Sequence, residues 1–136
     1  MTLDLNDSIA ELRRLNLPVP RPRRLPVESE VRAAEQLAGV AFHHDLRRYL
    51  LGASDVVCGT IEPVTIGGGH TDFGTVLRAA RDAGVPIDLV PVCEDNGDYY
   101  CIAPSGEVQY WSHNGSTDES WPDLASWIVE VWIGDR

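Results

Sequence analysis

The chain has 136 residues, 43% of them hydrophobic and 24% charged, and a formal net charge of −10 at pH 7. This length predicts one domain, 1–136, in which an N-terminal helix and connector (1–26) precede a core (27–136), and the apolar fraction excludes a disordered chain. No run approaches the ~20 apolar residues that cross a bilayer, and we find neither a secretory signal nor a CxxC pair. We therefore expect a reduced, cytoplasmic protein without a membrane partner.

Negative charge gathers in the later part of the chain. Residues 1–50 hold eight Arg against seven Asp and Glu, whereas residues 51–136 hold three Arg against fourteen. A phosphate backbone needs Lys or Arg to displace its counterions, so this balance disfavours nucleic acid and favours a basic protein partner. The alternative is an acidic surface that only keeps a small protein soluble.

The first predicted element is a short helix over 8–16, because Ser8 and Glu11 have the spacing of a capping box. Residues 17–26 then carry four prolines interleaved with arginines, which predicts an extended connector because proline removes backbone donors. These arginines either bind an acidic partner or pair with the acidic body of their own chain.

Three more helices follow in the core. Apolar residues recur at helical spacing over 27–38, 43–51 and 72–83. Between the last two, residues 56–66 predict one or two strands, limited by Pro63.

The later part of the chain predicts a three-stranded meander and a final helix. Asn96-Gly97 is a strong hairpin signal, because both central residues of its turn need a positive φ. The three strands span 88–94, 99–103 and 107–113, and the helix spans 121–133. The whole order predicts an α+β domain: a mainly antiparallel twisted sheet of about five to six strands, packed by N-terminal helices and a C-terminal helix.

Turn positions assign side chains to the faces of this meander. Two-residue turns at Asn96-Gly97 and Ser105-Gly106 would place Tyr100 opposite both Cys93 and Trp111. One face would then look like core, with Val90, Val92, Cys101, Ala103, Val108 and Tyr110. The other would carry Leu89, Cys93, Tyr100, Ile102, Gln109, Trp111 and His113, and it needs a covering helix or a partner.

These segments and turns carry a family resemblance over roughly residues 25–133. The matching stretches are Leu25-Pro26, 28–35, 37–40, 42–50, 96–101, 106–108, 111–113 and 121–128. They resemble the SUKH superfamily, which includes fungal cell-wall-assembly regulators and many bacterial immunity proteins. The resemblance implies a non-enzymatic binding domain, and in bacteria such domains often neutralise a cognate toxin, frequently a nuclease or deaminase.

Enzyme and metal chemistry find little support in the residue spacing. No HxxxH, HxxE or HEXXH pattern occurs, so we expect no metal and no cofactor. Gly67-Gly68-Gly69 is similar to a phosphate loop, but no Lys-Ser/Thr follows it. Cys58 or Cys93 with His113 as base would make a small hydrolase, although such thiols more often pack as small hydrophobes.

The leading hypothesis is an immunity protein that masks a basic toxin. We predict that Tyr100 and Trp111 supply contact area, and that Asp95 and Asp98 near the sheet rim, with His113, complete the protein-binding site. The same aromatic residues could instead pack beneath a helix. The alternatives are a regulatory scaffold that docks onto an endogenous protein, or the small hydrolase, and we expect a monomer or weak homodimer.

Overall fold

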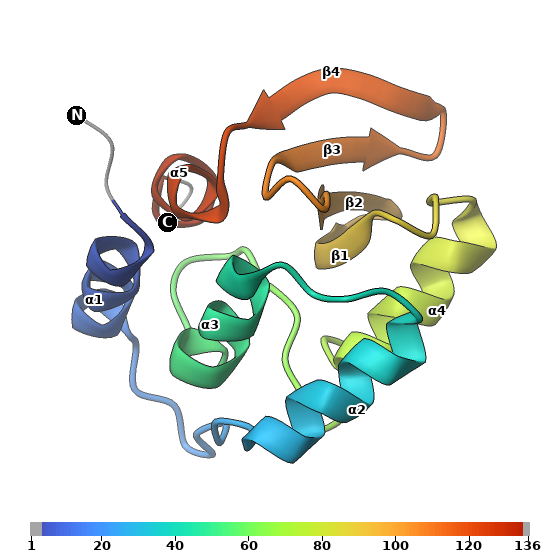
Figure 1. Ribbon diagram of the computed structural model, residues 1–136. Helices are drawn as coiled ribbons and strands as arrows, with labels where there is room; N and C mark the ends of the chain where they lie inside the picture. Colours follow the sequence, from blue (N-terminus) through green and yellow to red (C-terminus); the bar gives the residue numbers. More distant parts are fainter. Residues whose placement is uncertain (1–3, 135–136) are drawn as a thin grey trace.

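The structure, a computed structural model, describes residues 4–134 and, at residues 115 and 116, the backbone alone. Helices precede an antiparallel sheet of strand order β1-β2-β3-β4, and a short helix with a π-helical continuation follows it (Figure 1). The elements are α1 (Leu5–Leu15), α2 (Glu28–Ala38), α3 (His44–Ala53), α4 (Phe73–Ala83), β1 (Val90–Asp95), β2 (Asp98–Ile102), β3 (Val108–Ser112), β4 (Gly115–Trp121), α5 (Leu124–Trp127) and η1 (Ile128–Ile133). The α+β class is confirmed, but the sheet has four strands in the described residues rather than the predicted five to six.

Helix α1 begins earlier than the capping box predicted. The Asp4 carboxylate accepts the backbone N–H of Asp7 at 2.8 Å and so caps the helix. Ser8 is buried within the first turns, where its hydroxyl donates to the Leu5 carbonyl at 2.9 Å. The predicted start at Ser8 was therefore wrong, because an earlier acidic residue supplies the cap.

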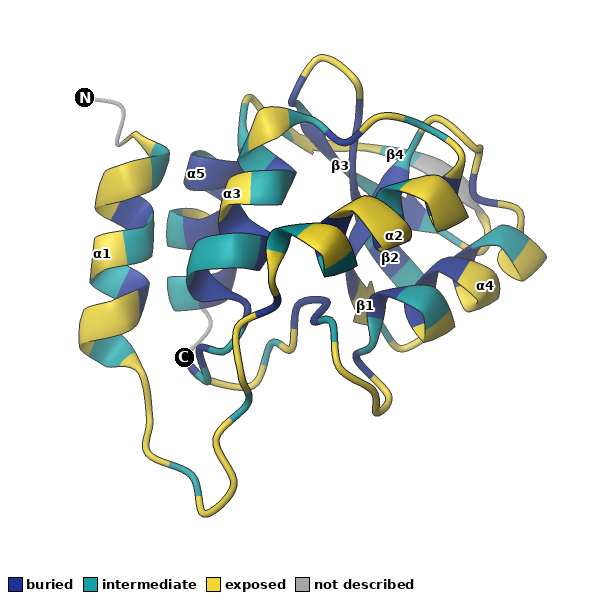
Figure 2. Cartoon of the chain, turned by 60° about the horizontal axis from the view of Figure 1, so that its bottom comes forward, coloured by how far each residue is buried: buried dark blue, intermediate teal, exposed yellow. Residues whose placement is uncertain are grey.

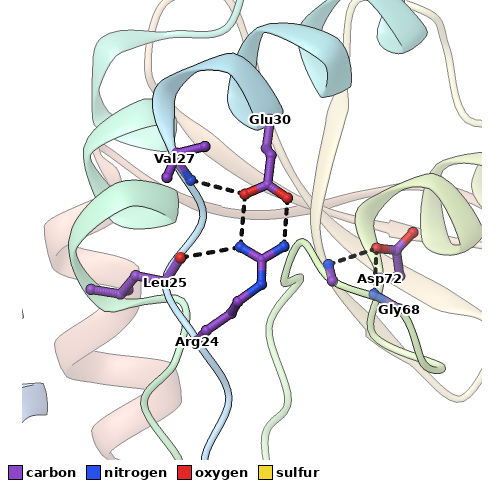
Figure 3. Close-up of polar contacts among 7 residues, drawn as sticks. Arg24, Leu25, Val27, Glu30, Gly68 and Asp72 are labelled. Atoms are coloured by element: carbon purple, nitrogen blue, oxygen red, sulfur yellow. Dashed lines mark hydrogen bonds and ion pairs between the residues drawn. The ribbon is translucent and has the colours of Figure 1, made fainter.

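The proline-rich connector lies between α1 and α2 and forms neither helix nor strand. Arg24 donates to both carboxylate oxygens of Glu30, at 2.7 and 2.5 Å (Figure 3). This hydrogen bonding, with a further bond from the Val27 backbone N–H, lowers the pKa of Glu30 to about 2. For Arg24, pairing with its own chain is thus confirmed.

The segment over 56–66 does not form the predicted strand. Within the described residues it makes two isolated bridges, Pro63 to Cys93 and Thr65 to Asp72. Pro63 lacks the N–H that a ladder needs, so pairing does not extend along the segment. The fourth strand of the sheet is β4, which was not predicted. Its sequence, GSTDESW, shows no alternation of apolar residues and so gave no strand signal.

The first hairpin turn follows the prediction. Asn96 and Gly97 have positive φ angles of 52° and 89°, and Cys93 pairs with Tyr100 beyond the turn. A bulge at Val92 then shifts the pairing by one residue.

The second turn is longer than predicted, and this corrects the assignment of faces. It is closed by a hydrogen bond of 2.8 Å from the Ala103 N–H to the Glu107 carbonyl, which leaves a three-residue loop. Tyr100 therefore pairs with Tyr110, and its expected partner Trp111 lies on the opposite face of the sheet.

Helices cover parts of both sheet faces, so core residues occur on each. Trp111 packs beneath the end of α4, where a Cβ added at Gly84 would lie 3.7 Å from its ring. On the other face, the rings of Tyr100 and Trp127 of α5 have centroids 5.3 Å apart. The helices turn their buried sides inward and their exposed sides to solvent (Figure 2).

Side chains from two helices donate hydrogen bonds to backbone carbonyl groups of the irregular segment over 56–66. The Tyr49 hydroxyl of α3 donates to the Val64 carbonyl at 2.7 Å, and the Trp132 indole N–H of η1 donates to the Cys58 carbonyl at 2.9 Å. Both donors are buried. These bonds replace the ladder that the segment lacks, because a buried carbonyl left unpaired is costly.

Replacing Tyr49 by Phe should lower the free energy of unfolding by about 1–3 kcal/mol, because the Val64 carbonyl would stay buried without its donor. Urea unfolding followed by circular dichroism measures the change. The control is Ser105→Ala, which removes the hydroxyl of an exposed residue where water can take its place, so its cost should be smaller. An equal loss of unfolding free energy in the two variants would show that the buried hydrogen bond contributes no more than an exposed one.

Candidate functional site

Three of the predicted binding residues, Asp95, Asp98 and His113, lie together with Tyr110 at the rim of the sheet. The Tyr110 hydroxyl lies 3.1 Å from an oxygen of Asp95 and 3.0 Å from one of Asp98. His113 joins them, since its backbone N–H and its ring Nδ1 lie 2.9 and 2.8 Å from the other Asp98 oxygen. These contacts link the β1–β2 turn to the end of β3. We call Asp95, Asp98, Tyr110 and His113 the rim cluster.

Tyr110 was missed as a site residue because the predicted register placed it in the core face. The observed register puts it beside Tyr100, on the face that also carries Asp98. A three-residue loop ending in glycine is the signal that could have corrected the prediction, since Gly106 has a φ of 94°.

Within the rim cluster, Asp98 keeps its negative charge near neutral pH. The His113 backbone N–H, the His113 ring and the Tyr110 hydroxyl lower the pKa of Asp98. Burial and the two neighbouring carboxylates raise the pKa of Tyr110, so its hydroxyl stays protonated and donates.

A groove of about 680 Å³ lies next to this cluster. Tyr100 of β2 and Trp121 of β4 contribute its aromatic surface, and their ring centroids are 5.7 Å apart. Its carboxylates come from separate segments: Glu62, Glu94, Asp95, Glu119 and Glu130. No Lys or Arg is among the described residues that line it, so it presents one sign of charge. We call this surface the acidic groove.

The acidic groove holds two of the predicted site residues and omits Trp111. Tyr100 and Asp95 line it, whereas Trp111 is 9% exposed and packs against α4. Trp121 stands beside Tyr100, where Trp111 was expected. Trp121 was missed because residues 115–121 were not predicted to be a strand.

The groove carboxylates differ in how far they are already engaged. Glu62 lies 2.6 Å from His70 Nε2, and Glu94 accepts the Gly97 backbone N–H at 2.8 Å. The carboxylates of Glu119 and Glu130 make no hydrogen bond or ion pair with any described residue.

Cys93 also lines the groove but is not poised for nucleophilic chemistry. Its side chain is buried, and its thiol lies 3.6 Å from the Glu62 carbonyl oxygen. Burial, with the nearby Asp95 charge, raises the pKa of the Cys93 thiol to about 12, so the reactive thiolate is scarce at neutral pH. The His113 ring, its suggested base, is engaged with Asp98.

Two further polar clusters have internal structural uses. Gly67 and Gly68 donate their backbone N–H groups to the Asp72 carboxylate at 3.1 and 3.0 Å, so this carboxylate occupies amides that a phosphate would need (Figure 3). The side chains of His43, His44 and Asp45 also lie together, within 4.8 Å of one another. There the His43 Nδ1 accepts a hydrogen bond of 3.1 Å from the Asp45 backbone N–H and so caps α3. This bond occupies the Nδ1 lone pair that would otherwise bind a metal ion.

Replacing Asp98 by Asn should destabilise the protein near neutral pH, and the deficit should shrink in acid. A carboxyl whose pKa is lowered in the folded chain stabilises the fold above its ordinary pKa and loses that effect as the pH falls through the lowered value. Urea unfolding of both proteins, in steps from pH 7 to about pH 2, measures this.

The control for this series is Asp82→Asn, at an exposed residue of α4, which should change stability little across the same range. A deficit of Asp98→Asn that stays constant down to the lowest pH would contradict the proposed electrostatic role of the rim cluster.

Known proteins share both the sequence pattern and the fold. The SUKH_5 family, described as SMI1-KNR4 cell-wall, matches residues 5–133. A solved structure, described as the crystal structure of a protein from Pseudomonas syringae pv. tomato, is 38% identical, with a TM-score of 0.90 over 95% of this chain and 98% of that one. No curated protein matches. No helix in the described part of the chain is both long and apolar enough to cross a bilayer. Because the family match spans almost the whole chain, this protein belongs to the SUKH_5 (SMI1-KNR4 cell-wall) family.

Proposed function

We propose that this protein is an immunity-type binding domain that neutralises a basic toxin by covering it with the acidic groove, without bond-making chemistry of its own. Membership of the SUKH_5 family supports a protein-interacting role. The single observation that carries the proposal is the acidic groove itself: aromatic rings bordered by carboxylates, with no basic residue among the described lining.

The charge of the groove suits rapid association with a basic partner. Carboxylates from the segment after α3, from β1, from β4 and from η1 face one concave surface. A surface of one sign concentrates field lines and speeds the approach of an oppositely charged protein. Tyr100 and Trp121 then add contact area that is buried at low entropic cost.

The toxin that an acidic groove would bind best is an enzyme with a basic substrate channel, such as a nuclease or a deaminase. Such an enzyme binds a polyanion, so its substrate channel carries Lys and Arg that neutralise phosphates. An acidic domain seated on that channel takes the place of the nucleic acid. The protein would act as a monomer or weak homodimer in the cytoplasm, where the toxin would otherwise reach its substrate.

A direct binding measurement tests this proposal. The purified chain should bind the protein encoded beside its gene, and its on-rate should fall steeply as ionic strength rises. The triple variant Glu94→Gln, Glu119→Gln, Glu130→Gln should lower the on-rate by about tenfold, since three steering charges are lost. Biolayer interferometry at several salt concentrations gives these rates.

The matched control is a triple variant that removes three exposed acids elsewhere, Asp7→Asn, Asp82→Asn and Asp88→Asn, and it should retain most of the on-rate. Failure to form any complex at micromolar concentration would count against a toxin partner. Capture of an endogenous enzyme with little salt dependence would favour the regulatory scaffold instead.

A further inference from the structure

We infer that the acidic groove binds the guanidinium group of an arginine side chain, which stacks on Tyr100 and Trp121 and pairs with Glu119 and Glu130. This inference rests on the proposed function and names the chemistry of the partner residue that occupies the groove.

The aromatic rings of the groove pack against one another, and the Tyr100 ring packs against two further rings. Tyr100 packs on Tyr110 with ring centroids 4.8 Å apart and on Trp127 at 5.3 Å. Trp121 meets Tyr100 at an interplanar angle of 60°. Both rings are half-buried and line the groove, so they offer it a preformed aromatic surface. A cation over such faces is attracted by the ring quadrupole.

Two uncommitted carboxylates lie beside these rings. Glu119 is two residues from Trp121 on β4, and both line the groove. Glu130 approaches from η1, a different element. Among the described residues neither carboxylate has a hydrogen-bond or ion-pair partner, unlike Glu62 and Glu94. The groove therefore keeps two charges available for a cation that arrives from outside.

Aromatic rings next to free carboxylates favour arginine over other cations. The guanidinium group is planar, stacks on aromatic rings, is weakly hydrated and donates two parallel hydrogen bonds to a carboxylate. A lysine ammonium group is compact and strongly hydrated, and gains less from a ring surface. A hard metal ion would need several converging oxygen ligands, which aromatic rings cannot supply.

Short peptides test this inference on the full chain. We would titrate it with amidated tri-arginine, tri-lysine and tri-citrulline, following the indole N–H signals by NMR, with Trp121→Phe used to assign the Trp121 signal. Tri-arginine should shift the Trp121 signal and bind at least tenfold more tightly than tri-lysine. Tri-citrulline, which keeps the shape but lacks the charge, should not bind.

Paired variants locate the site. Glu119→Gln with Glu130→Gln should weaken tri-arginine binding at least tenfold, whereas Asp82→Asn with Asp88→Asn, which removes the same charge elsewhere, should not. Thermal unfolding followed by circular dichroism confirms that each variant is folded. Equal affinity for tri-lysine, or an unchanged affinity of the groove variant, would overturn the inference.

The outcomes also separate this inference from the proposed function. Tri-arginine binding at Trp121 without any toxin complex would support the guanidinium site and remove the toxin. A tight toxin complex with no effect of tri-arginine at Trp121 would do the reverse. Self-association of the free chain that tri-arginine disrupts would make a second copy the occupant, and would overturn the assignment to a partner.

Discussion

The pairing of β2 with β3 is the constraint on which the rest of the molecule depends. The three-residue loop that closes at Ala103 and Glu107 sets which side chains share a face of the sheet. A Cβ added to Gly106 in this loop would lie 2.7 Å from His43 Nε2, so the loop also fits closely against the start of α3. In this register Tyr100 and Tyr110 stand together, and Trp111 is left to pack beneath α4. Trp111 is therefore part of the core, whereas Tyr100 lines the acidic groove.

A second dependence links the groove to the core. The segment over 56–66 has no strand ladder in the described structure, and the buried Tyr49 and Trp132 donors hold its carbonyls instead. This segment carries Glu62 to the edge of the acidic groove, while η1, which supplies the Trp132 donor, also supplies Glu130. The position of two groove carboxylates therefore follows from hydrogen bonds made in the interior.

The charges of the two parts of the chain are used differently. In the N-terminal part, arginines meet acids of their own chain: Arg24 pairs with Glu30, and Arg47 pairs with Glu28 and Glu35. In the C-terminal part there are few arginines, and Glu119 and Glu130 remain without a described partner. The acids of the N-terminal part are therefore largely neutralised by arginines, whereas carboxylates of the C-terminal part are not. The net charge of −10 is for this reason concentrated on one surface.

Local signals in the sequence determined the helices over 27–38, 43–51 and 72–83, the Asn96-Gly97 turn and the acidic balance, because each depends on neighbouring residues. The order of these elements also predicted the α+β class, and the sequence motifs carried the resemblance to the SUKH superfamily. Only the tertiary structure decided that 56–66 is irregular, that 115–121 is a strand, and that Trp121 rather than Trp111 stands beside Tyr100. Strand pairing brings together residues distant in the chain, and a turn longer by one residue moves every side chain of the next strand to the other face of the sheet. Apart from the glycine that ends the second turn, local patterns carry no information on this pairing. The acidic groove was likewise decided by the tertiary structure, since its carboxylates come from four separate segments of the chain.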